Sequence, residues 1–362
     1  RFNYDGYYQQ RIDIPYIKKN QKLSSSSWEE SLKILKNKLK SLKPLALVGE
    51  HVDLETGYAI NKFMSNFGKD NVECRTDNQA ILENLDSYRF NTPLNEIENS
   101  DLIILLGTNP KIETPIINHK IFKAYNNNSR IFNIGENIPL NYQTEYLGDK
   151  LSSLNNEKLI KALKKSSNPL IIIGSAFLNK IKNIKTLKSI FSFADKYNVI
   201  TKDKNNLNFL NPYASRVGQL ILGNTTKNLC EPFSKLKKEK FEIVLSFGSE
   251  HIASEQFDNC FRVYFGHHGD EGAMKSDIIL PTPLYTEKNG IFVNIEGRPQ
   301  EAKKCHNPIG SAKEEWSIVK KLSEEFSFVF EPNTFEQLRS ELLKKHTKLS
   351  IFHEILSNDN AS

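Results

Sequence analysis

Short runs of apolar residues alternate along this chain with longer segments in which apolar positions recur every three or four residues. The clearest apolar runs cover residues 45–48, 102–106 and 170–173. Runs of this length are typical of buried strands, and the spacing of three and four is typical of amphipathic helices. Their alternation predicts βαβ units and a largely parallel sheet.

The helix ends are marked by side chains that can cap them. Ser27 followed by Glu30 has the spacing of a capping box, and Pro44 prevents the helix from continuing into the next strand. Asp53 can cap a second helix, which we expect Gly68 to end. The other expected elements are strands at 101–106, 130–134, 170–173, 242–247, 262–265 and 277–280, and helices at 113–125, 184–197, 312–326 and 334–345.

Four of the predicted strands end in glycine, at Gly49, Gly107, Gly174 and Gly248. Ligands of open α/β sheets bind at the carboxyl ends of the strands, where helix N-termini present free N–H groups. The repetition predicts two related Rossmann-like layers of largely parallel sheet. Residues 202–232 are rich in asparagine and give too little periodicity to assign.

Composition and charge describe an ordinary globular chain. Of its 362 residues 38% are hydrophobic and 25% are charged, and the net charge is only +6. Lysines cluster at 33–43, interleaved with leucines of the predicted helix, and again at 235–240. We interpret both clusters as solvated faces rather than a nucleic-acid site, because nucleic-acid binders gather their charge into one patch.

The four cysteines, at positions 74, 230, 260 and 305, are widely spaced. Zinc and iron–sulfur ligation needs cysteines two to four residues apart, so we expect four reduced thiols. No run of about 18 apolar residues predicts a membrane span. The sequence starts at Arg1 without a signal segment, and we expect a processed chain or a piece of a longer one.

The most distinctive motifs lie between residues 266 and 300. They read GHHGD at 266–270, SDIILP at 276–281, YTEK at 285–288 and NIEGRPQ at 294–300, and we call residues 266–300 the signature segment. Earlier pieces are WEE at 28–30, GTNP at 107–110 and YLGD at 146–149. In order and spacing these motifs resemble the C-terminal, molybdopterin-oxidoreductase-like part of the large iron–sulfur subunit of respiratory complex I.

The resemblance implies a fold like that of formate dehydrogenase and DMSO reductase, with one α/β domain inserted in another. We expect a discontinuous first domain at 1–155 and 266–330, an inserted domain at 156–265, and a C-terminal helix and polar tail at 331–362. In active enzymes of the superfamily, turns comparable to that at Gly107 bind phosphates of a pyranopterin dinucleotide. We favour a vestigial, structural role for this turn over retained cofactor binding.

Metal chemistry has weak candidates. Cys74 and Asp77 lie where the resemblance places the molybdenum ligand, but Cys74 lacks the surrounding pattern. Adjacent histidines in a strand point to opposite faces, so we do not expect His267 and His268 to share a metal. We expect one of them to pack or hydrogen-bond against the turn beside Asp270. The cysteines that hold iron–sulfur clusters in the family are absent from this sequence, so clusters are expected in partner chains.

Two further constellations give little support to catalysis. Ser249-Glu250-His251 has no G-x-S-x-G elbow, which argues against a hydrolase. Arg298 can pair with Glu296 or Glu287. We therefore name no catalytic, cofactor-binding or metal-ligating residue.

The function that the resemblance implies is structural. We expect a part of the peripheral arm of NADH:ubiquinone oxidoreductase, on the matrix side of the mitochondrial inner membrane, encoded as a split subunit. Its expected partners are other complex I subunits, above all the chain with the iron–sulfur region. The alternative is a catalytic molybdopterin oxidoreductase domain that keeps its pyranopterin. A free nucleotide-binding module is a third possibility, but no G-x-G-x-x-G opens a helix here.

Overall fold

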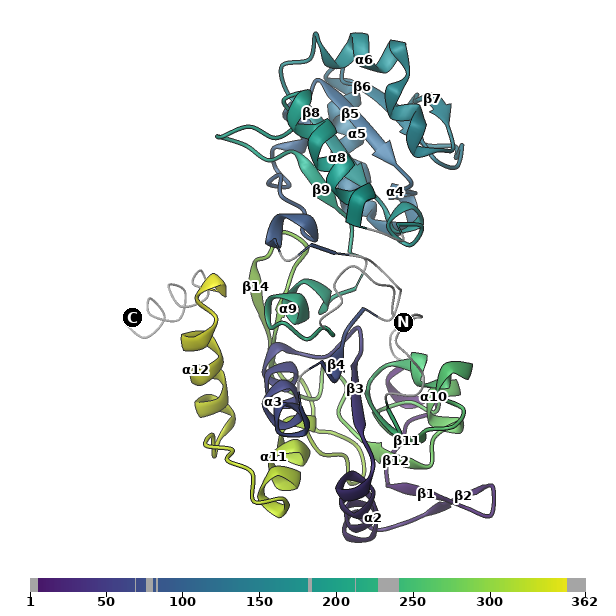
Figure 1. Cartoon of the computed structure of the whole chain (residues 1–362), viewed down its shortest axis with the longest axis vertical. Coiled ribbons are helices and arrows are strands. Elements are labelled where there is room, and N and C mark those ends of the chain that lie inside the picture. The colour runs from purple at the N-terminus through teal and green to yellow at the C-terminus, as the bar shows by residue number, and fades with distance from the viewer. Residues whose placement is uncertain are drawn as a thin grey trace.

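The computed structural model describes residues 6–68, 70–75, 81–82, 84–181, 184–211, 213–226 and 241–349, without the side chains of residues 250 and 251. Two lobes lie one above the other along the longest axis (Figure 1). The helices are α2 Trp28–Ser41, α3 Leu54–Met64, α4 Pro110–Glu113, α5 Pro115–Asn126, α6 Glu157–Leu163, α7 Ser175–Leu178, α8 Ile184–Lys196, α9 Arg216–Ile221, α10 Glu271–Met274, α11 Glu315–Glu325 and α12 Phe335–Lys345. The strands are β1 Tyr16–Lys19, β2 Lys22–Ser25, β3 Pro44–Val48, β4 Val72–Glu73, β5 Leu102–Leu106, β6 Arg130–Ile134, β7 Glu145–Gly148, β8 Pro169–Ile173, β9 Leu207–Phe209, β10 Ile243–Phe247, β11 Phe261–Gly266, β12 Ile278–Pro281, β13 Gly290–Val293 and β14 Pro299–Ala302.

The lower lobe is built on a seven-stranded sheet in the order β2-β1-β12-β11-β10-β3-β4. Strands β12 to β4 of that order are parallel, and the hairpin β1–β2 adds an antiparallel edge. Alternate strand residues face two cores, with Ala46 and Val48 packed among residues of α2, α3, α11 and α12, and Leu45 and Leu47 on the face that contains Ala273 of α10. Both faces are covered, which is why β3 is apolar at every position.

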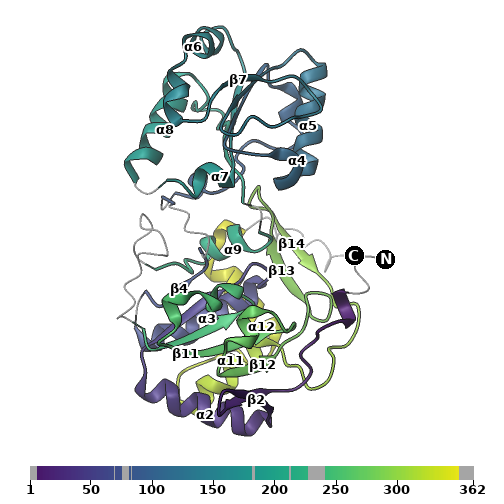
Figure 2. The ribbon, with the colours of Figure 1, turned by 90° about the vertical axis from the view of Figure 1, so that its right-hand side faces the viewer.

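The upper lobe contains a five-stranded sheet in the order β7-β6-β5-β8-β9, and all of its pairings are parallel. Ile104 and Ile171 belong to the core that α6, α7 and α8 cover. Ile103 and Ile172 belong to the opposite core, against α5. Figure 2 shows the two lobes from the side, with β13 and β14 extending from the lower lobe toward the upper one.

The nested arrangement is present, but its boundaries differ from those expected. Strands β5, β6 and β7 lie at 102–148, a range we assigned to the first domain, yet they pair with β8 and β9 in the second sheet. Strand β10, which we placed in the inserted domain, pairs with β3 of the first sheet. The expected ranges 1–155 and 156–265 are therefore wrong. The chain passes into the upper lobe before β5 and returns before α9, because hydrogen bonding rather than order along the chain decides sheet membership.

Most predicted elements are confirmed, with informative differences at their ends. The Ser27 side chain accepts from the Glu30 N–H at the start of α2, and Asp53 caps α3 by accepting from Thr56. Helix α3 ends at Met64, and a short 3-10 turn leads from there to Gly68, which has φ 118°. The helix expected over 113–125 is split into α4 and α5 in front of Pro115.

Strand order places a topological switch in the first sheet. From β3 the chain proceeds through α3 to β4 on one side, whereas β10 leads to β11 and β12 on the other side. Strands β3 and β10 are parallel neighbours, with Val48 opposite Phe247 at their carboxyl ends. A crevice opens at such a point, because the connecting segments leave in opposite directions.

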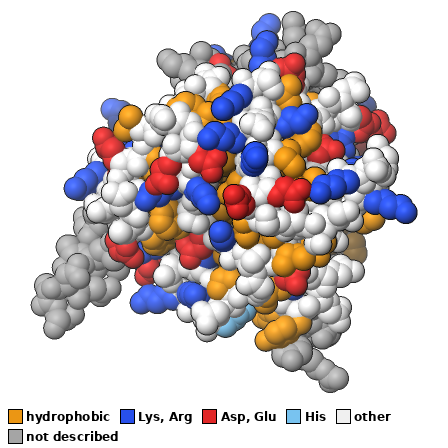
Figure 3. Space-filling view, turned by 90° about the horizontal axis from the view of Figure 1, so that it is seen from below, with side chains coloured by type: hydrophobic (Ala, Val, Ile, Leu, Met, Phe, Trp, Pro, Cys, Tyr) orange, Lys and Arg blue, Asp and Glu red, His pale blue; other side chains and the backbone are white. Residues whose placement is uncertain are grey.

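The charged surface agrees with a solvated face at the first lysine cluster. Lys33 and Lys40 are exposed on α2, Lys36 lies 3.5 Å from Glu325, and Lys38 lies over the ring of Phe261. From below, basic and acidic side chains are interspersed across the lower lobe (Figure 3). The second lysine cluster, at 235–240, lies outside the described residues.

Among the residues that the structure describes, no helix has the length and apolar character needed to cross a membrane.

Candidate functional site

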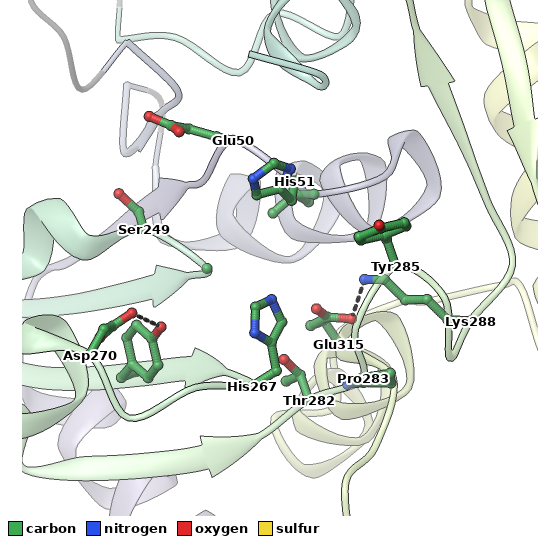
Figure 4. A pocket seen from close by; sticks show the side chains of 13 residues that line it. Glu50, His51, Ser249, His267, Asp270, Thr282, Pro283, Tyr285, Lys288 and Glu315 are labelled. Carbon is green, nitrogen blue, oxygen red and sulfur yellow. Dashed lines mark hydrogen bonds and ion pairs between the residues drawn. The ribbon is translucent and has the colours of Figure 1, made fainter. Parts of the chain in front are cut away.

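A cavity of about 210 Å³ lies at the switch point of the first sheet (Figure 4). Each of four parallel strands contributes the residues that directly follow its carboxyl end, which is the position predicted from the glycine-ended strands. The lining residues are Glu50, His51, Val52, Gly248, Ser249, Tyr264, His267, Asp270, Thr282, Pro283, Tyr285, Lys288 and Glu315. Most of them lie in the signature segment or in the turn after β3, so the motifs converge here.

His267 and His268 follow β11 and face each other, contrary to our expectation of opposite faces. Their rings are perpendicular and their Nδ1 atoms lie 2.6 Å apart. The strand ends at Gly266, so the alternation of strand side chains no longer applies to this pair. The Nε2 of His268 lies 2.7 Å from the carbonyl oxygen of Gly6, which can only accept, so this nitrogen donates.

The protonation state of His267 follows from its surroundings. Burial, followed by the positive charges of His268 and Lys288, lowers the pKa of His267 to about 3. The ring that points into the cavity is therefore neutral near pH 7 (Figure 4).

Lys288 lies between two buried carboxylates. Its Nζ is 2.9 Å from Asp53 and 2.8 Å from Glu315, and the side chains of all three are at most 8% exposed. Burial alone would lower the pKa of Lys288, but the two carboxylates outweigh it and raise that pKa. The same burial raises the pKa of Glu315. This triad joins the signature segment to the starts of α3 and α11.

Tyr264 and Ser249 complete the polar wall. The hydroxyl of Tyr264 donates to Asp270, whose other carboxylate oxygen accepts from the Ala273 N–H and so caps α10. Asp270 thus binds Tyr264 through its carboxylate, and its N–H donates to the carbonyl oxygen of His268 at 3.1 Å. Ser249 is buried, and its hydroxyl has no hydrogen-bond partner among the described residues. The side chains of Glu250 and His251 lie outside the description, so the expected absence of a hydrolase triad stays a prediction.

The residues just outside the cavity bind the N-terminal segment. Arg11 donates to Glu287 at 2.7 Å, and both side chains are at most 2% exposed. The Ile12 N–H donates to the carbonyl oxygen of His267 at 3.0 Å. Glu287 therefore pairs with Arg11 and not with Arg298, the partner that the sequence allowed. Arg298 is exposed and forms no ion pair with any residue in the described part of the chain.

The end of the signature segment holds the connection between the lobes. The Leu94 N–H donates to the Glu296 carboxylate at 2.9 Å, and the Phe90 N–H donates to the carbonyl oxygen of Ile295 at 2.8 Å. Residues 90–94 belong to the segment that leads to β5. Glu296 therefore also has a different role from the arginine pair that we expected.

A further buried carboxylate, that of Glu55, links the signature segment to the C-terminal helix α12. Glu55 accepts from the Ile291 N–H at 2.9 Å and from Arg339 of α12 at 2.6 Å. Burial and the nearby charge of Asp53 raise the pKa of Glu55 to about 7. Arg339 also lies 2.6 Å from Glu301, so it bridges α3 and β14.

The Gly107 turn contains a different arrangement, at the carboxyl edge of the second sheet. The carboxylate of Glu113 accepts from the Asn109 N–H at 2.7 Å through one oxygen and from the Ser175 N–H at 2.9 Å through the other. Gly107 has φ +60°, and a Cβ there would lie 2.4 Å from that of Phe177. The turn is tightly packed, and the N–H groups of Asn109 in the turn and of Ser175 beside it are already paired with a carboxylate. As it stands, this turn does not fit the phosphate of a pyranopterin dinucleotide.

The candidate metal ligand lies in a core. Cys74 follows β4, is 3% exposed and belongs to the cluster that includes Ile60 and Val72. Its neighbours Glu73 and Arg75 form a buried ion pair at 2.7 Å. Asp77 and Cys230 lie outside the described residues. Within the described ranges no group of three or more histidines, cysteines, aspartates or glutamates is placed to hold a metal ion.

Sequence patterns did not indicate the Lys288 triad. Asp53 was predicted only as a helix cap and Glu315 was not singled out, although Lys288 lies within a recognised motif. A usable signal existed, since Lys288 is followed by the apolar strand β13 and a buried lysine needs carboxylate partners. Which carboxylates would serve depends on the fold.

Comparisons with known proteins agree with the motifs. The family model described as "Molybdopterin oxidoreductase" matches residues 11–325. An NADH-quinone oxidoreductase subunit of Rickettsia bellii is 34% identical over 99% of this chain and 53% of its own length. The NADH-ubiquinone oxidoreductase 75 kDa subunit of Reclinomonas americana is 34% identical over 95% of this chain and 53% of its own length. The chain spans about half the length of the curated relatives that it matches.

Solved structures show the same fold at low sequence identity. A chain of the formyltransferase/hydrolase complex from Methylorubrum extorquens has a TM-score of 0.62 at 10% identity, covering 87% of this chain and 99% of that one. Acetylene hydratase from Pelobacter acetylenicus has a TM-score of 0.54 at 13% identity, covering 88% of this chain and 62% of that one. These likenesses confirm the predicted α/β fold class.

Proposed function

This chain belongs to the molybdopterin oxidoreductase family, and on that premise we propose that it is a structural part of the peripheral arm of NADH:ubiquinone oxidoreductase, without a redox centre of its own. Relatives named as subunits of NADH-quinone and NADH-ubiquinone oxidoreductase cover 90–99% of the chain and support this choice of complex. The clusters that carry electrons from NADH to quinone would then lie in partner chains, above all the one that bears the iron–sulfur region.

One observation carries the proposal: charged side chains of the signature segment form their ion pairs and hydrogen bonds within the chain. Glu287 binds Arg11 of the N-terminal segment, and Lys288 binds Asp53 and Glu315. Glu296 binds the connection to the upper lobe. These contacts join distant parts of the chain and make the segment a structural hub.

The buried ion pairs make the hub rigid. Removing one partner of a buried pair leaves an uncompensated charge and costs about 3–5 kcal/mol. A rigid support is what a neighbouring electron-transfer chain requires, because its clusters must keep a fixed spacing and stay shielded from water. We propose a position on the matrix side of the inner mitochondrial membrane, and a split encoding of the subunit with the iron–sulfur region on another chain.

Catalysis by a retained pyranopterin is the second reading of the family. A retained pyranopterin would place a phosphate at the Gly107 turn. Within the described part of the chain, the carboxylate of Glu113 already accepts hydrogen bonds from the N–H groups at that position. We therefore favour the structural function.

Native purification of the tagged chain from its own cells tests the proposal. We expect the chain to migrate with NADH dehydrogenase activity and with chains that contain iron–sulfur clusters. A chain that migrates alone, or with an assembly lacking that activity, would contradict the proposed function.

A further inference from the structure

We propose that Glu113 takes the place of a ligand's phosphate at the carboxyl ends of β5 and β8, so that the chain closes an oxyanion site with its own carboxylate. The inference rests on the proposed function, since it explains how this lobe stays ordered without a phosphate-bearing cofactor. It also names the ligand class, a tetrahedral oxyanion, that the position would accept if the carboxylate were removed.

The geometry is that of a bound anion. One oxygen of Glu113 accepts from the Asn109 N–H at 2.7 Å, and the other accepts from the Ser175 N–H at 2.9 Å. Asn109 follows β5 and Ser175 follows β8, and these strands are parallel neighbours with Leu106 opposite Ile173. The carboxylate therefore bridges two adjacent strand ends, as oxyanions do in open α/β sheets.

Ordinary helix capping does not account for both contacts. The Asn109 contact is local, four residues before Glu113, and would satisfy an N–H group at the start of α4. The Ser175 contact joins residues 62 positions apart, in separate strand-to-helix connections. A cap for α4 needs no partner after β8, so the second contact points to a role in holding the two connections together.

The surrounding turn keeps features that suit a larger oxyanion. Gly107 and Gly174 bring the connections into contact, since a Cβ at Gly174 would lie 2.3 Å from that of Thr108. Thr108 is 6% exposed, and its hydroxyl finds no hydrogen-bond partner among the residues described. Each carboxylate oxygen of Glu113 accepts one of the two N–H groups, whereas a phosphate has further oxygens that a third donor can reach. Among the described residues the turn thus holds an unpaired hydroxyl, that of Thr108, next to the Asn109 donor.

While Glu113 is in place, its charge and its two hydrogen bonds exclude a second anion. Removing the side chain to Cβ frees both N–H groups and vacates the space that the carboxylate filled. Replacing it by glutamine removes the charge but keeps the space filled, and its amide can pair with only one of the two N–H groups. Glu113→Ala therefore leaves the anion position open, whereas Glu113→Gln leaves it blocked.

The test is rescue of thermal stability by inorganic phosphate in the purified chain. We expect Glu113→Ala to melt below the wild type, and saturating phosphate to raise its midpoint by about 3 °C or more relative to sodium chloride of equal ionic strength. Phosphate should move the midpoints of the wild type and of Glu113→Gln by less than about 1 °C on the same comparison. Equal shifts in all three proteins, or no shift for a folded Glu113→Ala, would overturn the inference.

A measurement on the wild type keeps the test decisive if Glu113→Ala does not fold. In chains with labelled Asn and Ser amides, we expect the amide proton resonances of both Asn109 and Ser175 to differ between the wild type and Glu113→Gln, because both amides donate to the same carboxylate. A change at Asn109 alone would contradict the bridging carboxylate. Because both experiments use the isolated chain, they succeed or fail separately from its assembly into an NADH-oxidising complex.

Discussion

Arg11 and Glu287 form a buried ion pair at 2.7 Å between residues 276 positions apart, and it fastens the N-terminal segment to the signature segment. Each side chain is at most 2% exposed. The neighbouring contact of His268 with the carbonyl oxygen of Gly6 holds the same segment from a second point. The first residues described are thus part of the hub around the cavity.

The strength of this pair can be measured by a double-mutant cycle. We expect Arg11→Met and Glu287→Gln each to destabilise the chain, and their combination to cost less than the sum by about 1–3 kcal/mol, because the second change removes a charge already left unpaired. Urea denaturation of the four proteins gives the coupling. The pair Lys161–Glu157, at 78% and 89% exposure, is the matched control and should show little coupling. If the losses in free energy of unfolding from Arg11→Met and Glu287→Gln were additive, the two side chains would not stabilise each other.

Lys288→Met should be among the most damaging single changes in the lower lobe. It leaves Asp53 and Glu315 buried without their shared ammonium, and we expect a loss of about 3–5 kcal/mol in the free energy of unfolding. Denaturant unfolding measures this loss. Lys275→Met, at a half-exposed lysine that directly follows α10, serves as the control and should cost under about 1 kcal/mol. If the two variants were equally stable, the triad would not hold the segment together.

Glu55 predicts a specific pH dependence of stability. Its pKa is about 7 in the folded chain, owing to burial and then the charge of Asp53, against 4.5 as the ordinary value. The folded chain therefore binds one more proton than the unfolded chain between these pH values, and stability from this group falls as pH rises from about 4.5 through 7. Arg339 and the Ile291 N–H also face the carboxylate and work against the shift.

The difference between wild type and Glu55→Gln isolates this contribution. We expect the wild type to lose stability relative to the variant as pH rises from about 5 to about 8, by a few kcal/mol at most. Thermal or denaturant unfolding across that range gives the difference. His267 contributes in the opposite sense, because its pKa is lowered and its stabilisation is lost as pH falls below 6.5, but it is common to both proteins. A difference that stays constant with pH would show that Glu55 does not titrate in this window.

Close packing at the Gly107 turn can be separated from backbone strain by a matched pair of substitutions. Gly107→Ala places a Cβ 2.4 Å from that of Phe177 at φ +60°, whereas Gly223→Ala at φ +74° meets no atom within 4 Å. Both variants incur the left-handed penalty of roughly 1–2 kcal/mol, and the first adds overpacking of about 1–3 kcal/mol. Denaturant unfolding should therefore give Gly107→Ala a clearly lower free energy of unfolding than Gly223→Ala. The reverse order would mean that the two connections are not packed as described.

The sequence predicted local features well because their causes are local. Ser27 and Asp53 cap the helices that follow them, and the apolar runs at β3, β5, β8 and β10 are strands. Assignment of β5 and β10 to their sheets failed, since an apolar run that ends in glycine looks the same in either sheet. Only hydrogen-bond pairing puts β10 beside β3, across a long insertion.

The position of the cavity at the sheet edge was predicted, but the contacts among its residues were not. The glycine-ended strands indicated which sheet edge to examine, and the signature segment supplies His267, Asp270, Tyr285 and Lys288 to its wall. The partners of those residues could not be predicted, because Glu315 and Asp53 reach Lys288 only after α3 and α11 have packed together. Similarly, the contact of Glu113 with Ser175 depends on the pairing of β5 with β8, which no local pattern reveals.

The most direct test of the central proposal is a metal and pterin analysis of the native assembly that contains this chain, together with mass spectrometry of every co-purifying protein. We predict complex I subunits beside the chain, iron assigned to clusters in those partners, and neither molybdenum, tungsten nor pterin in proportion to the chain. Molybdenum or pterin at close to one per chain would contradict the structural function.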